Sequence, residues 1–254
     1  MTLIDTIILG ALQGITEFLP ISSSGHLVLG QALLGIEIPG NAFEVVTHLG
    51  TLLSVFCVFW KDIISLVSKI NHKESQKYLS FIVFGSLPAI VVGLVGKKMI
   101  SDVFDSVNLV SSALMFTGLV LFLSQKLKSG SNPISLRNGF MIGLAQAVAI
   151  IPGISRSGMT ITIAMAMGIS GKEAAKFSFL LAIPAISGAG LLTALDTSFS
   201  LISIPYMFLF SAFLSAFIVG YFSLKWLLGL LESGRFHLFG YYCIFVGLLT
   251  LIMI

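Results

Sequence analysis

The chain has 254 residues, of which 56% are hydrophobic and only 10% are charged. Soluble domains carry about 25% charged residues, and 14 Lys and Arg with 11 Asp and Glu cannot cover a globule of this size with a polar surface. The composition therefore excludes a water-soluble protein and predicts an integral membrane protein built from helices. The net charge of +3 comes from scattered residues, so nucleic-acid binding is not expected.

Two kinds of apolar region alternate along the chain. The first region, about residues 3–38, is interrupted by LPISSSGH at 19–26, and a second, about 138–170, is interrupted by PGISRSGMT at 152–160. Three apolar segments follow each interrupted region, and each is long enough for a helix that spans a bilayer: 43–60, 78–96, 107–124, 177–195, 204–224 and 238–254.

Neither half of an interrupted region is long enough to span a membrane. A backbone broken by Pro, Gly and hydroxyl residues cannot face lipid, because its free N–H and C=O groups would lack partners. We therefore predict that each interrupted region forms a re-entrant helix pair, which enters the membrane, turns at the polar sequence and leaves by the same face.

The two halves of the chain resemble each other at an offset of 133 residues. Gln13 matches Gln146, and the serines and glycine of the first polar sequence match those of the second. We predict one membrane domain, residues 1–254, with a first repeat at about 3–124 and a second at about 136–254. Three spans per repeat is an odd number, so the second repeat must be inverted. The expected fold is all-α, with six transmembrane helices and two re-entrant pairs.

The basic residues indicate the orientation. On this topology, eleven of the 14 lie on loops or helix ends at the face opposite the N-terminus, and Lys97 and Lys98 lie at the other face. Because cytoplasmic loops are enriched in Lys and Arg, we expect both termini to lie outside the cytoplasm. The two polar turns then enter from opposite faces and can meet inside the protein.

The second polar sequence has the composition of an anion site. Gly153 permits a tight turn, the following helix offers unpaired N–H groups, and an arginine stands among hydroxyls. The hydroxyl residues are Ser155, Ser157 and Thr160. They are also good helix caps, and an arginine can extend to a membrane interface. Because an arginine inside a membrane is costly, Arg156 favours a functional site.

The first polar sequence offers acid–base groups. Gln13 and Glu17 are four residues apart and so share one face of a helix. A buried carboxylate needs a partner, which can be Arg156, His26 or a divalent cation. The turn that follows adds three hydroxyls and an imidazole, from Ser22, Ser23, Ser24 and His26. A diphosphate carries about three negative charges at neutral pH, so we expect Mg²⁺ or Ca²⁺ held by Glu17 and substrate oxygens.

At these residues the sequence resembles the undecaprenyl-pyrophosphate phosphatase family, the integral-membrane enzymes associated with bacitracin resistance. The family's first motif is present from Gln13 to Glu17 and continues as FLPISSSGH, and its second motif, PGxSRSxxT, is matched at 152–160. The likeness extends to FEVVTHLGTL at 43–52 and KFSFLLAIPA at 176–185. One departure is Gln13, where many members carry Glu, so a two-carboxylate metal site is not expected.

The resemblance implies a bacterial inner-membrane hydrolase that removes the terminal phosphate of undecaprenyl pyrophosphate and regenerates the lipid carrier for peptidoglycan synthesis. The family's key positions fall on Gln13, Glu17, Ser23, His26, Ser155, Arg156 and Thr160. Our hypothesis is that His26 or Ser23 attacks the terminal phosphorus, with His26 preferred because Ser23 needs a base. Arg156 and the hydroxyls of its motif would stabilise the developing charge, and Glu17 would orient His26 or the metal.

Several alternatives stay open at the level of sequence. Inverted repeats with broken helices are also typical of secondary transporters, so a polyprenyl-phosphate flippase or an anion transporter is the competing interpretation. Glu44 and His48, four residues apart, either support the site or form a polar pair within the bundle. The expected partners are the lipid diphosphate and membrane lipid, and a homodimer is one oligomeric state open to the chain.

Overall fold

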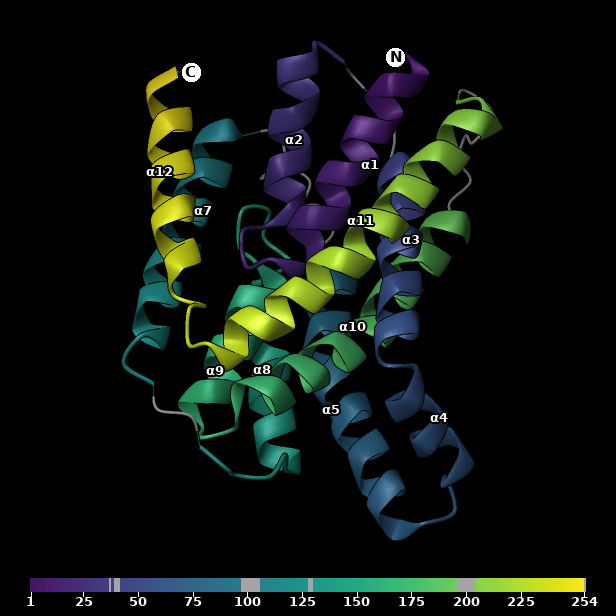
Figure 1. Ribbon diagram of the computed structural model, residues 1–254, viewed down its shortest axis with the longest axis vertical. Helices are drawn as coiled ribbons and strands as arrows, with labels where there is room; N and C mark the ends of the chain where they lie inside the picture. The colour runs from purple at the N-terminus through teal and green to yellow at the C-terminus, as the bar shows by residue number, and fades with distance from the viewer. Residues whose placement is uncertain (37, 39–41, 97–105, 128–129, 196–203, 254) are drawn as a thin grey trace.

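A computed structural model describes residues 1–36, 38, 42–96, 106–127, 130–195 and 204–253. Within these residues every regular element is a helix, as the composition predicts. Figure 1 shows that both chain ends lie at the same end of a helical bundle.

The first interrupted region forms two short helices. α1 (Leu3–Phe18) and α2 (Ser23–Leu34) are separated by a turn at residues 19–22, and they pack against each other. α1 begins with a capping box, in which the Thr2 hydroxyl accepts from the Asp5 N–H and the Asp5 carboxylate accepts from the Thr2 N–H. The predicted reversal at the polar sequence is therefore observed, with the turn confined to its first half.

In the described part of the first half, the next helices are α3 (Ala42–Val58), α4 (Trp60–Ser68), α5 (Lys73–Val95) and α7 (Val107–Ser124). α3 and α4 meet at Phe59 with a bend of 73°. α4 buries none of its side chains, and its Trp60 and Val67 are largely exposed. Such a short helix, apolar on one side and following a sharp bend, is typical of a segment that lies along a membrane surface.

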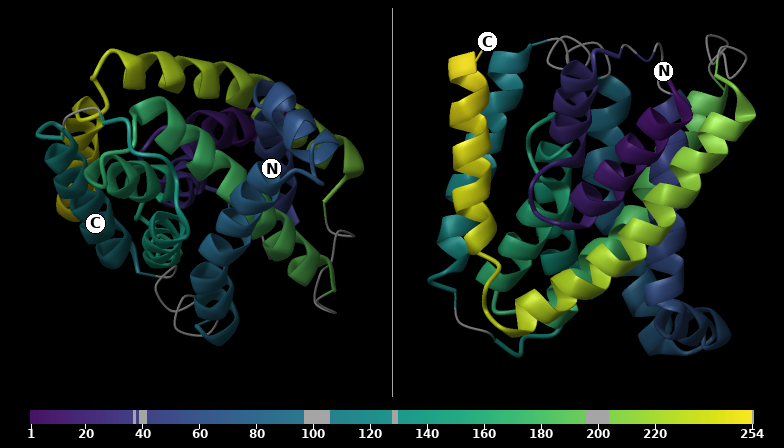
Figure 2. Two further views of the ribbon diagram at one scale, coloured as in Figure 1. Left: turned by 90° about the horizontal axis from the view of Figure 1, so that it is seen from below. Right: turned by 45° about the horizontal axis from the view of Figure 1, so that its top comes forward.

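The second half has a similar order, without a counterpart of α4 among the described residues. α8 (Leu136–Val148) and α9 (Arg156–Ala166) flank the second polar turn. The described helices that follow are α10 (Gly171–Leu195), α11 (Tyr206–Glu232) and the shorter α12 (Leu238–Met253). Figure 2 shows α11 crossing one side of the bundle obliquely, where it packs against α1 and α3.

Each of the six predicted spans contains a helix, but the count of six is not confirmed. Among the described residues, four helices are long and apolar enough to cross a membrane, or five if the bent pair α3 and α4 is one span. α12 has 16 residues and is shorter than these helices. The chain is thus an all-helical, multi-pass membrane protein with four or five candidate spans.

Small residues bring the short helices against long helices from the other half of the chain. α1 packs on α11, and α8 packs on α5. A Cβ atom at Gly10 would lie 2.5 Å from the Ala212 carbonyl oxygen, and one at Gly143 would lie 2.0 Å from the Gly85 carbonyl oxygen. These backbones therefore approach more closely than any residue with a side chain allows.

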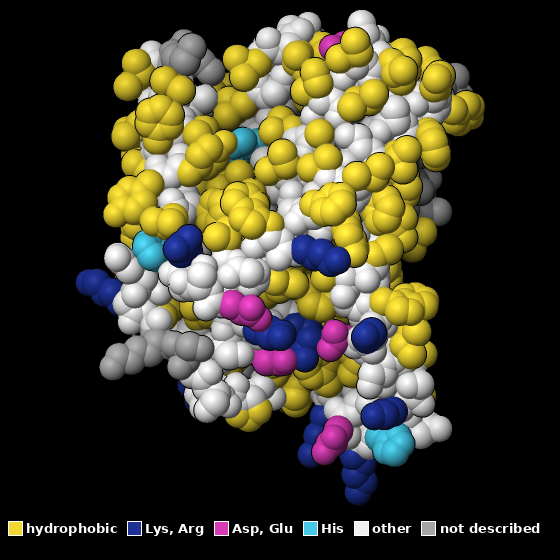
Figure 3. All heavy atoms as spheres, in the orientation of Figure 1, with side chains coloured by type: hydrophobic (Ala, Val, Ile, Leu, Met, Phe, Trp, Pro, Cys, Tyr) yellow, Lys and Arg dark blue, Asp and Glu magenta, His cyan; other side chains and the backbone are white. Residues whose placement is uncertain are grey.

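The apolar core and the charged surface occupy different places. The largest buried cluster joins the helices around the two polar turns and includes Phe18, Ile161, Phe177 and Phe179. Figure 3 shows that most of the surface on one face is apolar and that the basic side chains gather toward the end opposite the chain termini. α4, the start of α5 and the start of α10 lie at this basic end (Figure 1).

Candidate active site

The two polar turns meet through a buried ion pair. Glu17 stands in the last turn of α1 and Arg156 is the first residue of α9, so both side chains are placed by helix ends. The Arg156 Nη2 donates to Glu17 Oε1 at 2.5 Å, and the two side chains are only 16% and 5% exposed. Of the three partners open to Glu17, the structure therefore provides Arg156, 139 residues away in the chain.

The other carboxylate oxygen of Glu17 is also engaged. Glu17 Oε2 accepts from the Ser23 hydroxyl at 2.7 Å and from Gln13 Nε2 at 3.0 Å. His48 Nε2 lies 3.5 Å from the same oxygen. The predicted proximity of Gln13 and Glu17 on one face of α1 is confirmed, and His48 of α3 lies beside the carboxylate as one of the two sequence interpretations expected.

Hydrogen bonds between the turns fix their relative position. The Gly153 N–H donates to the Ser22 hydroxyl at 3.1 Å, and the Ser157 hydroxyl donates to the Leu19 carbonyl at 3.3 Å. Thr117 of α7 bridges the second turn, because its hydroxyl donates to the Gly153 carbonyl and accepts from the Ser155 N–H, both at 3.0 Å. Together these bonds hold the two tips as one unit.

Two residues in the turns have backbone conformations of the left-handed region. Gly153 has φ 93°, and a Cβ atom there would lie 2.4 Å from the Val110 carbonyl oxygen, so only glycine fits. Ser22 has φ 67°, which is uncommon for a residue with a side chain. Such strain persists only where the surroundings impose it, and here the Ser22 hydroxyl holds the Gly153 N–H.

The hydroxyls of the second motif are mainly bound within the protein. Ser155 caps α9 by accepting from the Gly158 N–H at 3.1 Å, so its capping interpretation is confirmed. Ser157 lies 3.2 Å from the Ser155 hydroxyl. Thr160 donates to the Arg156 carbonyl at 2.7 Å and lies 2.6 Å from the Ser178 hydroxyl. These buried bonds position Arg156, and they differ from the open cradle that the sequence suggests.

His26 lies in the first turn of α2 and has its own set of partners. Its Nδ1 lies 2.8 Å from the Ser22 carbonyl oxygen and its Nε2 lies 2.8 Å from the Tyr242 hydroxyl. The sequence predicts that Glu17 orients either His26 or a metal; among the described residues the imidazole is held by Ser22 and Tyr242 and has no hydrogen bond to Glu17. In the first turn, Ser24 contacts only the Ser22 hydroxyl among the hydrogen bonds of the described residues, at 3.4 Å.

Sequence reasoning missed four residues that shape the site: Thr117, Ser178, Phe179 and Tyr242. Thr117, Ser178 and Tyr242 form the hydrogen bonds given above, and Phe179 lies under the Arg156 guanidinium at 5.9 Å from ring centroid to carbon. All four stand within long apolar segments that read as ordinary spans. The only signal for Ser178 and Phe179 is their place within KFSFLLAIPA, one of the stretches that carries the family resemblance.

Two buried polar atoms of the site have no hydrogen-bond partner among the residues that the structure describes. They are Arg156 Nη1 and Gln13 Oε1, both adjacent to the Glu17 carboxylate cluster. A buried donor or acceptor without a partner is costly, and it commonly marks a place where a ligand or water binds. An unpaired guanidinium N–H is a strong donor to a phosphate oxygen.

The residues also fit a divalent cation, provided that a phosphate shares it. Mg²⁺ is commonly held by one or two carboxylates together with substrate oxygens, and the site offers the Glu17 carboxylate and the free Gln13 Oε1. Among the described residues, however, no group of three or more His, Cys, Asp or Glu stands ready to hold a metal ion. A cation at Glu17 would therefore need the diphosphate to complete its ligands.

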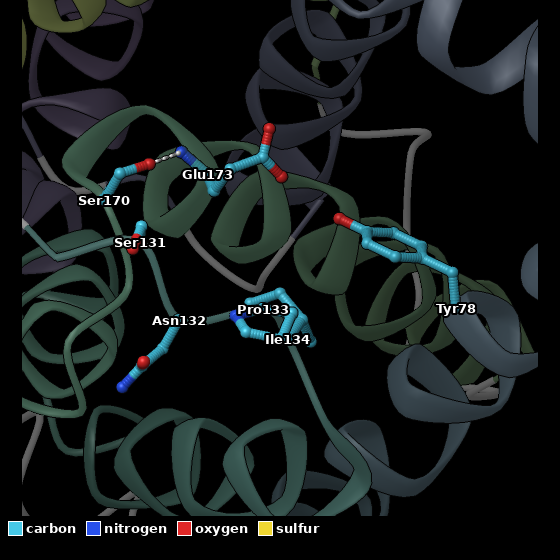
Figure 4. Close-up of a pocket in the computed structure, with 7 residues that line it drawn as sticks. All are labelled: Tyr78, Ser131, Asn132, Pro133, Ile134, Ser170 and Glu173. Atoms are coloured by element: carbon cyan, nitrogen blue, oxygen red, sulfur yellow. Dashed lines mark hydrogen bonds between the residues drawn. The ribbon is translucent and has the colours of Figure 1, made fainter.

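A separate cavity lies away from both motifs. It has a volume of about 370 Å³ and is lined by residues of α5, α10 and the segment before α8. Figure 4 shows Tyr78 and Glu173 on one side of it and Asn132 on the other. None of the residues predicted for the active site lines this cavity.

The fold and the site define a class: a helical membrane protein in which two polar turns, each between short helices, join in a buried carboxylate–guanidinium centre. The chain belongs to the bacitracin resistance protein BacA family, whose model matches residues 6–249.

Three relatives that match nearly the whole of this chain are named undecaprenyl-diphosphatase. A protein of Methanosphaera stadtmanae named undecaprenyl-diphosphatase is 37% identical to this chain, and the match covers 100% of this chain and 98% of the relative's length. The undecaprenyl-diphosphatase of Desulforapulum autotrophicum is 40% identical over 99% of this chain and 98% of its own. The undecaprenyl-diphosphatase 1 of Bacillus cereus is 39% identical over 98% of this chain and 96% of the relative's length.

Proposed function

We propose that this protein is an undecaprenyl-diphosphate phosphatase, which hydrolyses undecaprenyl diphosphate to undecaprenyl phosphate and inorganic phosphate. The observation that carries the proposal is the Glu17–Arg156 pair, which joins two distant motifs in a buried place and leaves Arg156 Nη1 free. Full-length relatives named undecaprenyl-diphosphatase support the same activity. The product is the lipid carrier of peptidoglycan synthesis, and a higher rate of its regeneration would give bacitracin resistance.

Arg156 would bind the terminal phosphate. Its Nη2 is held by Glu17 while its Nη1 is free to donate to a phosphate oxygen. Phosphoryl transfer is catalysed mainly by positioning and by stabilising charge on the equatorial oxygens. The hydroxyls of Ser155, Ser157 and Thr160 would contribute indirectly, by fixing the start of α9, and Gly153 with Ser24 would shape the wall of the phosphate site. When bound, Mg²⁺ or Ca²⁺ at Glu17 and Gln13 would neutralise further phosphate charge.

His26 would act as the nucleophile through Nε2. Because a carbonyl oxygen only accepts hydrogen bonds, the bond to Ser22 requires a proton on Nδ1 and leaves the Nε2 lone pair available in the neutral ring. Nε2 would form a bond to the terminal phosphorus while the bridging P–O bond breaks and undecaprenyl phosphate leaves. Water would then hydrolyse the phosphohistidine to release phosphate.

Ser23 is the competing nucleophile, and the structure supplies the base that the sequence did not reveal. Its hydroxyl donates to Glu17 Oε2 at 2.7 Å, so the carboxylate could take its proton. The two mechanisms leave different intermediates. With substrate labelled at the terminal phosphorus, acid quenching destroys phosphohistidine and preserves phosphoserine, whereas alkali does the reverse. Label that survives alkali and is lost from His26→Ala would support His26, and label that survives acid would support Ser23.

The proposed membrane arrangement is an inverted repeat of six crossings and two re-entrant pairs, with repeats at about 3–124 and 136–254. Its support is the exchange of contacts between halves: α1 packs on α11 as α8 packs on α5, and α7 packs on its own counterpart α12. The gathering of basic residues at the end opposite the termini supports termini outside the cytoplasm. We place the protein in the bacterial inner membrane, where the lipid substrate resides.

The test of the function is phosphate release from undecaprenyl diphosphate by the purified protein in detergent. We expect release in the presence of Mg²⁺ or Ca²⁺ and a lower rate with chelator, because one arginine only partly offsets a diphosphate. Absence of release with either cation would favour a flippase or anion transporter. Light scattering of the same preparation tests the homodimer, which stays a prediction.

A further inference from the structure

Among the described contacts, the residue nearest to His26 Nε2, the proposed reactive nitrogen, is Tyr242 of α12, which lies outside both motifs. Its hydroxyl lies 2.8 Å from His26 Nε2. The two rings are also stacked, with 5.6 Å between centroids and 14° between planes. Because Nδ1 carries a proton for the Ser22 carbonyl, Nε2 of the neutral imidazole accepts and the Tyr242 hydroxyl donates.

The exposed fractions of the two residues indicate that Tyr242 lies on the outer side of His26. His26 is 6% exposed, whereas Tyr242 is 42% exposed. Tyr242 comes from a helix that packs mainly on α7, and α12 with α2 has no extensive contact among the described residues. The tyrosine therefore covers His26 from the apolar surface of the bundle, where the hydrocarbon tail of a lipid substrate must lie.

We propose that Tyr242 is a positioning residue for His26, which fixes the imidazole and covers Nε2 until a diphosphate enters. This inference rests on the proposed function. In the empty site the Tyr242 hydroxyl donates to Nε2. On entry of the terminal phosphate the Tyr242 hydroxyl turns away from Nε2, and the freed Nε2 lone pair faces phosphorus. Tyr242 keeps its proton throughout, so no further acid or base is required.

The adjacent tyrosine provides a matched control. Tyr241 lies on the same helix and is 61% exposed. Its ring packs edge-on against Phe122 of α7, with 4.7 Å between centroids. Tyr241→Phe and Tyr242→Phe thus remove the same hydroxyl from neighbouring positions, but only the second removes the hydrogen bond to His26.

The first measurement needs no substrate. Diethylpyrocarbonate modifies unprotonated imidazole nitrogen, and residue-resolved mass spectrometry of the full-length protein in detergent follows each histidine separately. His237, whose Nδ1 also lies near a carbonyl oxygen, at 3.1 Å, serves as the internal reference. We expect Tyr242→Phe to raise the modification rate of His26 relative to His237 about tenfold, the effect of losing one hydrogen bond of about 1.4 kcal/mol. Tyr241→Phe should leave this ratio unchanged.

The second measurement is turnover of undecaprenyl diphosphate. Because the imidazole loses its orientation, kcat of Tyr242→Phe should fall about tenfold while KM changes little, since the stacked ring remains. An unchanged His26 modification rate in Tyr242→Phe would overturn the proposal, as would a rate raised equally in Tyr241→Phe. The modification assay is independent of hydrolysis, so a failure of the proposed function and a failure of this inference are distinguishable.

Discussion

At the scale of single residues, the Glu17–Arg156 pair should show strong coupling. Glu17→Gln leaves a buried guanidinium without its counter-ion, and breaking such a pair commonly costs about 3 to 5 kcal/mol. The double variant Glu17→Gln, Arg156→Gln removes both charges and should recover part of the lost thermal stability in detergent, while hydrolysis stays abolished. Additive losses of stability in the double variant would show that the two side chains do not interact.

Sequence alone leaves Arg156, His26 or a divalent cation as the partner of Glu17, because a charge within an apolar region must find a partner, and the structure selects Arg156. Sequence also places Gln13 beside Glu17 through the periodicity of a helix. It could not identify Tyr242 or Thr117, since a tyrosine or threonine within an apolar span normally has no special role. Nor could it show that Ser23, and not His26, is bonded to Glu17, because that depends on how the chain turns at Ser22.

At the scale of helices, the close approach of α8 and α5 should tolerate no side chain. A Cβ at Gly143 would meet the Gly85 backbone oxygen at 2.0 Å, so Gly143→Ala must push the helices apart. We expect a loss of about 2 kcal/mol or more, seen as a lower unfolding temperature by scanning fluorimetry. Gly93→Ala is the control, because nothing lies within 4 Å of its Cβ position and alanine favours the helix. Equal stabilities of the two variants would contradict the described packing.

The interruptions were predictable at this scale, and the bend was not. Pro, Gly and serine clusters mark both turns, and the structure breaks its helices there. The apolar run from Phe43 ends at Trp60, close to the end of α3 at Val58, but its composition does not show that a second helix, α4, continues at 73° to the first. A bend between two helices depends on what α4 packs against, which a single apolar pattern does not record.

At the scale of the whole molecule, the arrangement predicts the sides on which chain segments lie. In a variant without Cys57 and Cys243, a single cysteine at Thr2 should react with a membrane-impermeant maleimide in intact cells. A cysteine at His72, between α4 and α5, should react only after the membrane is permeabilised. Reaction of both positions in intact cells, or of neither, would contradict the inverted arrangement.

The offset of 133 residues predicts the repeat from sequence, but the exchange of partners between repeats needs coordinates, because matched residues say nothing about which half they contact. This exchange brings Glu17 and Arg156 together, since each polar turn is carried by helices that pack on the other half. The shape of the site is thus a property of the duplicated whole and not of either motif.

The most direct test of the account is the rate of phosphate release from undecaprenyl diphosphate by purified Arg156→Lys, compared with wild type and with Arg137→Lys, a change at an exposed arginine of α8. Lysine keeps the charge but lacks the planar fork that donates to Glu17 and phosphate at once. We predict that kcat/KM falls by about 100-fold or more in Arg156→Lys and is unchanged in Arg137→Lys. Equal rates for wild type and Arg156→Lys would contradict the assignment of this centre as the active site.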